Sequence, residues 1–219
     1  MLGANFLLEW VLPSRSPVAT TLVSDLQAVG RPWAAAFRAG DVTSSVLLAV
    51  LAAWGLRTGD RGRRWRAGLL AVLASAAGTA AAALVPETCT PVPGAAPCPF
   101  DAGAAAHEVA SVLAVGGALA GALLLWLAER SRRPGEPSAV RRGRVHLATA
   151  LLAAASGAVV LAGRYADLPH LLGWPQRVQI LVLSAWCVAI GRSVAARDGE
   201  KHALRTIDAR RAQEQDPVP

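Results

Sequence analysis

The chain has 219 residues, of which 53% are hydrophobic and 17% are charged, and its formal net charge is +7. The low charged fraction and the clustering of apolar residues in long blocks argue against an ordinary soluble domain. A net positive charge would suit a nucleic-acid partner, but the positions of the basic residues, given below, argue against that class.

The first predicted element is the apolar segment at residues 1–12, MLGANFLLEWVL. It lacks the basic start and the small-residue cleavage site of a signal peptide, and it is too short to cross a bilayer alone. We interpret it as the first of six membrane spans, and the alternative that this span is truncated stays open.

Residues 21–41, TLVSDLQAVGRPWAAAFRAGD, place charged side chains next to membrane-like sequence. The segment carries Asp25, Arg31, Arg38 and Asp41, and a Gly-Arg-Pro sequence interrupts it. We predict that it forms the outer connection between the first and second spans. Arg38 and Asp41 are three residues apart, so they are close enough to pair on a helix.

Local signals within this connection predict a helix that lies at the outer membrane surface. Ser24 is a good N-cap, and Asp25 follows in the first turn, where a negative charge complements the helix dipole. Trp33 and Phe37 are four residues apart, so they would share one helical face at the level of the headgroups.

Five further spans follow along the chain. The apolar blocks at 68–85 and 109–128 are long enough as they stand, because about 20 residues at about 1.5 Å each cross a hydrocarbon core of about 30 Å. The blocks at 42–56 and 147–163 reach this length with their flanks. The block at 178–191 reaches it only if residues 171–177 extend the helix outward. The sequence therefore predicts an all-α polytopic transmembrane helix bundle over residues 1–195, followed by a polar tail over residues 196–219.

The basic residues sort to one side of this six-span arrangement. Of the 22 Lys and Arg residues, 17 fall in the 57–66 loop, the 130–144 loop and the tail from Arg192. Because Lys and Arg gather on the cytoplasmic side of membrane proteins, we predict cytoplasmic termini and a multi-pass protein of the plasma membrane. The basic loops would then contact anionic lipid headgroups in the bilayer, and no nucleic-acid partner is predicted.

Three cysteines fall in two settings. Cys89 and Cys98 lie in the 86–103 loop, which the charge bias places outside, where disulfides persist. We favour a disulfide between them over two free thiols. Two cysteines without a second pair or a nearby His-x-His give too few zinc ligands, so no metal is predicted. Cys187 lies within the last span and is expected to be a packing residue.

Small residues within the spans predict close helix packing. Gly117 and Gly121 form a small-xxx-small pair, and residues 74–83 are nearly all small. Such surfaces let membrane helices approach closely. We favour packing within the chain, and a homo-oligomer interface on these helix faces stays open.

Four segments of the chain resemble a known family. They are ANFLLEWVLP, then SDLQAVGRPWAAAFRAGD, then a Cys-containing outer loop that runs into DAGAAAHEVAS, and finally GWPQR at the head of the last span. Together they are similar to the bacterial integral membrane family catalogued as domain of unknown function 998, over residues 4–193. The resemblance implies a multi-span bundle and supplies no reaction, cofactor or catalytic residue. Members generally begin with a fuller first span, from which this chain departs.

Polar and ionisable residues gather on the predicted outer side. Groups of this kind near span ends are costly, and they usually face the bundle interior or a wet cavity. His107 and Ser111 are one helical turn apart and would share a face, while Glu9 and Glu108 also stand near span ends. The predicted binding cluster consists of Asp25, Arg31, Arg38, Asp41, Asp101, His107, Ser111 and Arg177.

Three classes of function stay open. We favour a non-enzymatic membrane protein whose outer cluster binds a lipid, a small ligand or a partner. In the second class, a membrane hydrolase or transferase, His107 would act as base, Asp41 or Asp101 would orient it, and a serine would be the nucleophile. No His-Glu-x-x-His or Gly-x-Ser-x-Gly motif supports this class. The third class is a small-solute transporter, for which charged residues near mid-bilayer and a repeated half are missing.

Overall fold

The protein is an all-helical membrane bundle. The computed structural model describes residues 5–12, 18–58, 62–89, 101–132, 136–166 and 168–215. Its elements are the short 3-10 helices η1 (Asn5–Trp10), η2 (Ser24–Gln27) and η3 (Pro169–Leu171) and the α-helices α1 (Ala34–Thr58), α2 (Arg63–Leu84), α3 (Ala102–Arg132), α4 (Pro137–Tyr165) and α5 (Gly173–Gln215). Within these residues there is no strand.

Five of the six predicted spans are present as helices long and apolar enough to cross a membrane. The shortest, α2, has 22 residues, or about 33 Å of helix, which exceeds a hydrocarbon core of about 30 Å. The predicted first span differs. Its described residues form the six-residue helix η1, which is too short to cross, so a sixth span stays a prediction.

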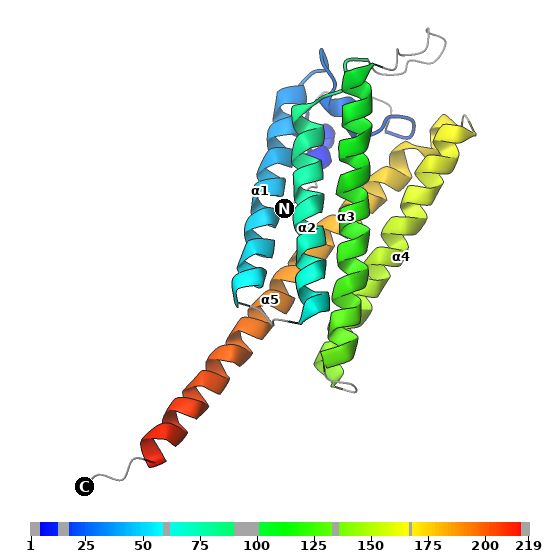
Figure 1. Cartoon of the computed structure of the whole chain (residues 1–219). Helices are drawn as coiled ribbons and strands as arrows, with labels where there is room; N and C mark the ends of the chain where they lie inside the picture. The colour runs from blue at the N-terminus through cyan, green and yellow to red at the C-terminus, as the bar shows by residue number, and fades with distance from the viewer. Residues whose placement is uncertain are drawn as a thin grey trace.

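The helices pack in chain order. α1 contacts α2, α2 contacts α3, α3 contacts α4, and α4 contacts α5. α1 to α4 stand side by side, and α5 crosses obliquely behind them, so that its C-terminal part projects beyond the bundle (Figure 1). The end of the bundle that carries η2, residue 87 and residue 173 is called the outer end below, following the predicted orientation, and the opposite end is the basic end.

Glycines bring α2 and α3 into close contact. A Cβ atom on Gly117 would lie 2.7 Å from the Ser75 backbone nitrogen, and one on Gly78 would lie 2.5 Å from the Ala114 backbone nitrogen. Gly121 likewise faces the carbonyl of Gly68. The predicted small-residue surface therefore packs within the chain. Whether a second copy also binds the protein stays open.

Bulky side chains fill the space between α5 and the other helices at the basic half. The hydrophobic core there contains Trp65 and Leu69 of α2, Leu125 of α3, and Trp186 and Ile190 of α5, all 2% exposed or less. The outer half has only a small apolar cluster of Phe6, Val23, Leu26 and Phe37. A bundle packed this unevenly leaves room for a cavity in its outer half.

α5 confirms one sequence prediction and extends another. The last span begins at Gly173, as required for residues 178–191 to reach spanning length. The predicted tail continues it as one unbroken helix to Gln215, 43 residues in all, or about 65 Å.

The predicted 130–144 loop is shorter than expected, because two helices run into it. α3 continues to Arg132 and α4 begins at Pro137, where proline fits the first helical turn. Most of this loop is therefore helical, and residues 133–135 lie outside the described residues.

The 21–41 segment differs from the predicted surface helix. η2 has no side-chain cap from Ser24, and it ends before Gly30, whose φ of 80° is in the left-handed region that glycine adopts readily. α1 then starts at Ala34, so the second half of the segment is the first part of a span. Trp33 is half exposed, whereas Phe37 is 1% exposed in the outer apolar cluster. The prediction that both rings lie at the headgroups is therefore wrong for Phe37.

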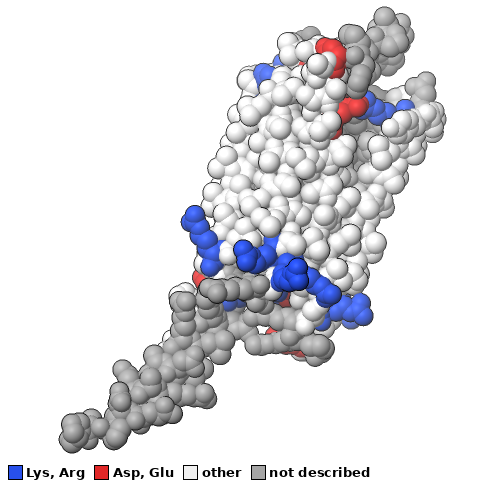
Figure 2. Space-filling view, in the orientation of Figure 1, with Lys and Arg blue, Asp and Glu red and all other residues white. Residues whose placement is uncertain are grey.

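Charged side chains occupy the two ends of the bundle, and an uncharged band separates them on the face shown in Figure 2. A belt of arginines surrounds the basic end. Its exposed members include Arg57, Arg63, Arg64, Arg66, Arg130, Arg141, Arg144 and Arg192. The described parts of the 57–66 and 130–144 regions thus lie at one end, and the end of α2 and the start of α3 lie at the other, which agrees with the predicted sorting of the loops.

Candidate functional site

A cavity of about 220 Å³ opens in the outer half of the bundle, between α5 and the helices α1, α2 and α3. It extends from η2 at the outer end to Trp186 and Cys187, near the middle of the spanning part of α5. Its wall includes apolar side chains, such as Leu48 and Leu183. The polar residues that line it are Ser24, Gln27, Asp41, Ser44, Ser45, Ser75, Thr79, His107, Ser111, Gln176, Gln179 and Ser184.

The structure brings three of the predicted site residues to this cavity. Asp41 of α1 and His107 and Ser111 of α3 all line it, and the prediction that His107 and Ser111 share a face is confirmed. Asp41 accepts a hydrogen bond of 2.5 Å from the Gln27 amide nitrogen. Because a neutral amide takes this position, the predicted pairing of Asp41 with Arg38 is not needed to hold the carboxylate in place.

His107 is held from outside the cavity. Its Nδ1 atom lies 3.1 Å from the Ala82 carbonyl oxygen and 2.9 Å from that of Val85. Because a carbonyl oxygen accepts only, Nδ1 must carry the hydrogen. Its Nε2 atom lies 3.5 Å from a carboxyl oxygen of Glu87. Glu87 is therefore the carboxylate beside His107, in place of Asp41 or Asp101.

A pair of carboxyl groups closes the outer end above His107. The two carboxyl groups, Asp25 and Glu87, are near enough to influence each other's pKa. Burial raises the pKa of Asp25, although the hydrogen bond from the Leu22 amide and the charges of Arg31 and Arg164 oppose this. Burial also raises the pKa of Glu87, with His107 opposing. The Val29 N–H donates to the Glu87 carbonyl oxygen at 3.0 Å, which joins the segment after η2 to the end of α2.

Arg177 joins η1 and the 18–23 segment to α5 through buried contacts with Glu9 and with backbone carbonyls, which are together called the latch below. Its Nε and Nη2 atoms lie 2.6 and 2.7 Å from the two carboxyl oxygens of Glu9, and both side chains are 2% exposed. Its Nη1 atom donates to the carbonyl oxygens of Val18, Thr21 and Gly173. Arg177 thus joins the N-terminal segment to α5 rather than entering the cavity.

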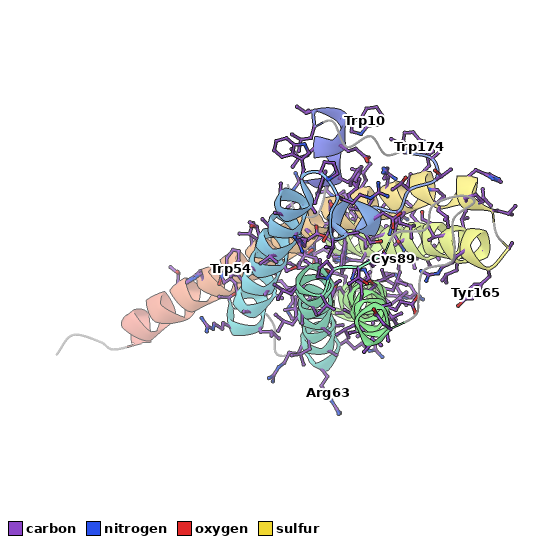
Figure 3. The ribbon with its side chains drawn as sticks, turned by 90° about the horizontal axis from the view of Figure 1, so that it is seen from above. Trp10, Trp54, Arg63, Cys89, Tyr165 and Trp174 are labelled. Atoms are coloured by element: carbon purple, nitrogen blue, oxygen red, sulfur yellow. The ribbon has the colours of Figure 1, made fainter. Side chains whose placement is uncertain are left out.

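The rest of the GWPQR segment completes this latch. Gly173 packs so closely on the 18–19 backbone that a Cβ atom would lie 1.9 Å from the Val18 carbonyl oxygen, and its N–H donates to the Ala19 carbonyl. The Gln176 side chain accepts the Val23 N–H at 2.5 Å. Trp174 packs against Trp10 with ring centroids 6.3 Å apart, at one edge of the bundle seen from above (Figure 3).

A protein-family model described as "Protein of unknown function (DUF998)" matches residues 3–193. The chain belongs to the DUF998 family. The match covers both the cavity and the latch. No curated protein and no solved structure matches the chain significantly.

Besides Asp25 and Arg177, three predicted site residues of this DUF998 protein lie away from the cavity wall. Arg31 is half-buried beside Asp25. Arg38 is half-buried on α1. Asp101 is exposed and caps α3, since its carboxyl oxygen accepts the Ala104 N–H at 2.8 Å. The predicted cluster is thus divided among the cavity, the Asp25–Glu87 pair, the latch and a helix cap.

A second buried network, which was not predicted from the sequence, lies at the basic end of the DUF998 bundle. Glu129 of α3 is fully buried and lies 3.2 Å from Arg142 Nε of α4 and 2.9 Å from Arg197 Nη2 of α5. The Arg197 guanidinium also lies over the Trp65 ring, 3.8 Å from its centroid. The sequence places Glu129 and Arg142 in a stretch rich in charge, so nothing distinguished them from solvated side chains.

His146 continues this network towards the cavity. It is fully buried, and its Nδ1 atom accepts a hydrogen bond of 2.8 Å from Trp186 Nε1. Its Nε2 atom lies 3.4 Å from Ser193 Oγ. Because Trp186 also forms part of the cavity wall, one indole ring separates the outer cavity from the buried polar groups below.

Two further predictions concern cysteines and metals. Cys98 lies outside the described residues, so the predicted Cys89–Cys98 disulfide stays a prediction. Cys187 is buried with a free thiol on α5, as expected of a packing residue. Among the residues that the structure describes, no group of three or more His, Cys, Asp and Glu side chains is placed to hold a metal ion.

Proposed function

We propose that this DUF998 protein binds a small polar ligand, or the headgroup of an outer-leaflet lipid, in its outer cavity. The observation that carries the proposal is the cavity itself. A polar network that only locked helices together would be filled by its own side chains, since protein interiors are close-packed. Here polar groups on α1, α2, α3 and α5 converge on about 220 Å³ of space.

The size and walls of the cavity favour a compact ligand. Its volume lies below the range of about 300–1,000 Å³ that is typical of small-molecule pockets. Several lining hydroxyls already donate to backbone carbonyls, and an occupant would use the acceptor sites that remain. The mixture of polar and apolar side chains on the wall would suit an amphipathic molecule.

We favour binding over hydrolysis because of the position of His107. Its two ring nitrogens face backbone carbonyls and Glu87, so neither nitrogen is directed at Ser111 by a hydrogen bond. A catalytic base needs to reach the proton that it removes. The hydrolase arrangement of His107 with Asp41 or Asp101 would require these contacts to rearrange.

The proposal also includes the location of the protein and its orientation in the membrane. The arginine belt supports a plasma-membrane location with the basic end in the cytoplasm, where it would contact anionic headgroups. The outer cavity would then receive its ligand from the extracytoplasmic side.

Native mass spectrometry of protein extracted from its membrane tests the proposal. Wild-type protein should carry an adduct of defined mass that survives detergent exchange. Ser111→Leu, which fills the cavity, should lose the adduct. Val112→Leu is the matched control, because the neighbouring Val112 is 72% exposed on the outside of the bundle. Equal spectra for the wild type and both variants would contradict the proposal.

A further inference from the structure

Four of the seven hydroxyl groups that line the outer cavity are oriented in the same way. Ser45, Ser75 and Ser184 donate to the carbonyl oxygens of Asp41, Ala114 and Ile180, each at 2.7 Å. Thr79 donates to the Ser75 carbonyl at 3.0 Å. A carbonyl oxygen has no hydrogen to donate, so each hydroxyl must donate its own hydrogen to the backbone. The four oxygens therefore present lone pairs, which are acceptors, to the cavity.

Two of the three glutamine side chains on the wall continue this pattern. The Gln179 amide nitrogen donates to the Ala153 carbonyl at 2.9 Å, away from the cavity, so its oxygen remains as an acceptor. The Gln27 amide nitrogen donates to Asp41. Gln176 is the exception, because its oxygen accepts the Val23 N–H and its –NH₂ group remains as a donor. The other three hydroxyl groups on the wall, those of Ser24, Ser44 and Ser111, can donate or accept.

The charged and aromatic side chains of the cavity lining also favour a ligand that donates hydrogen bonds. Among the described residues that line the cavity, Asp41 supplies the carboxylate, and no Lys or Arg is present. His107 has its Nδ1 hydrogen on backbone carbonyls. Trp186 directs its N–H to His146, so its indole ring offers the cavity ring carbons and no hydrogen-bond donor.

Acceptors and one carboxylate are the partners that a cation with N–H donors requires. We propose that the outer cavity selects a ligand through a primary ammonium group. This inference rests on the proposed function and narrows the ligand to one chemical class. An inorganic phosphate would meet lone pairs and a like charge, and it is disfavoured. The ammonium group has two possible sources, a free small amine or the headgroup of phosphatidylethanolamine.

The test uses the full chain in phosphatidylglycerol nanodiscs and measures thermal stabilisation against probe concentration. The probes are ethanolamine, tetramethylammonium, glycerol and inorganic phosphate. We expect ethanolamine to bind most tightly. Tetramethylammonium has the charge without N–H donors, so its affinity should be lower. Phosphate should give no stabilisation.

Two variants and one control link this binding to the cavity. Asp41→Asn keeps the Gln27 contact but removes the charge, so ethanolamine affinity should fall on the order of tenfold or more, as for a charge-assisted hydrogen bond. Ser184→Ala removes one acceptor and should reduce the affinity less. Ser131→Ala is the control, since Ser131 is exposed at the basic end of α3, and it should bind ethanolamine as the wild type does.

A second set of nanodiscs that also contains phosphatidylethanolamine separates the sources. If the lipid headgroup is the ligand, free ethanolamine will no longer stabilise the protein there. An unchanged effect identifies the free amine, and either result supports an ammonium site. Tighter binding of phosphate or glycerol, or an unchanged ethanolamine affinity in Asp41→Asn, would overturn the ammonium class and leave the cavity as a binding site. No binding of any probe, together with equal native spectra for Ser111→Leu and wild type, would refute both proposals.

Discussion

Replacing Glu9 by Gln should destabilise the protein strongly, because it leaves the buried Arg177 guanidinium with an uncompensated charge. Both side chains of the pair are 2% exposed, and two hydrogen bonds of 2.6 and 2.7 Å join them. Removing one partner of such a pair costs about 3–5 kcal/mol. At about 2–4 °C per kcal/mol for a chain of this size, the midpoint of thermal unfolding should fall by roughly 6–20 °C.

The exposed pair Arg164–Glu108 supplies the matched control. It has a similar contact but side chains that are 54% and 44% exposed. Exposed pairs contribute up to about 1 kcal/mol, so Glu108→Gln should lower the midpoint by less than about 4 °C. Both variants can be compared with the wild type by heating in one detergent and measuring the folded fraction by size-exclusion chromatography.

A double variant separates charge from hydrogen bonding. Glu9→Leu with Arg177→Met removes both charges, and buried ion pairs replaced by apolar residues often lose little stability. Recovery should nevertheless be partial, because the carbonyls of Val18 and Thr21 would lose their donor. An equally small change in Glu9→Gln and Glu108→Gln would refute the reasoning that the latch is buried and holds the outer segment in place.

Four other predictions can be checked separately. Gly117→Ala should lower the unfolding midpoint, since overpacking costs about 1–3 kcal/mol. Gly116→Ala, whose Cβ would meet nothing within 4 Å, should not, and equal midpoints would contradict the close α2–α3 contact. Because the pKa of Glu87 is raised in the folded protein, stability should be greatest in acid and fall as pH rises from about 4.5. Relative to the wild type, Glu87→Gln should therefore become more stable as pH rises, when the two unfolding midpoints are measured over a pH series. Midpoint-versus-pH curves that run parallel for the two proteins would count against the Asp25–Glu87 pair. Impermeant maleimide should label an engineered cysteine at position 95 but not at 135 in intact cells, and the reverse pattern would invert the topology. Non-reducing mass spectrometry should find Cys89 and Cys98 two hydrogen masses lighter than the dithiol, whereas two alkylated thiols would exclude the disulfide.

The five long helices could be predicted because membrane helices follow from local composition. Apolar blocks of sufficient length identify them, and the glycines at 117 and 121 indicated a close packing face. The start of α1 could not be predicted in the same way. The 21–41 segment was predicted as a helix at the membrane surface, but α1 begins at Ala34, directly after Trp33 with its φ of 64°, and continues into the span eight residues before the apolar block at 42–56.

The candidate site was less predictable, because its contacts join residues far apart in sequence. Glu9 and Arg177 were both recognised as ionisable groups near span ends, yet their pairing depends on how η1 folds over α5. Asp41, His107 and Ser111 could be assigned to one membrane level but not to one cavity. Glu129 and His146 were missed, since burial at the basic end depends on helix crossing and not on local sequence.

The oblique course of α5 has a consequence for the membranes that suit this protein. Arg177 and Arg197 are 20 residues apart on one continuous helix, so about 30 Å of helix separates two buried guanidinium groups. Each is fixed to a carboxylate, Glu9 at one end and Glu129 at the other. Because α5 is tilted, the separation of the two guanidinium groups along the membrane normal is less than the length of helix between them. The two polar ends of the bundle cannot move apart without breaking one of these ion pairs. The bundle should therefore match a bilayer with a hydrocarbon thickness at or below about 30 Å, and a thicker bilayer would have to thin around it.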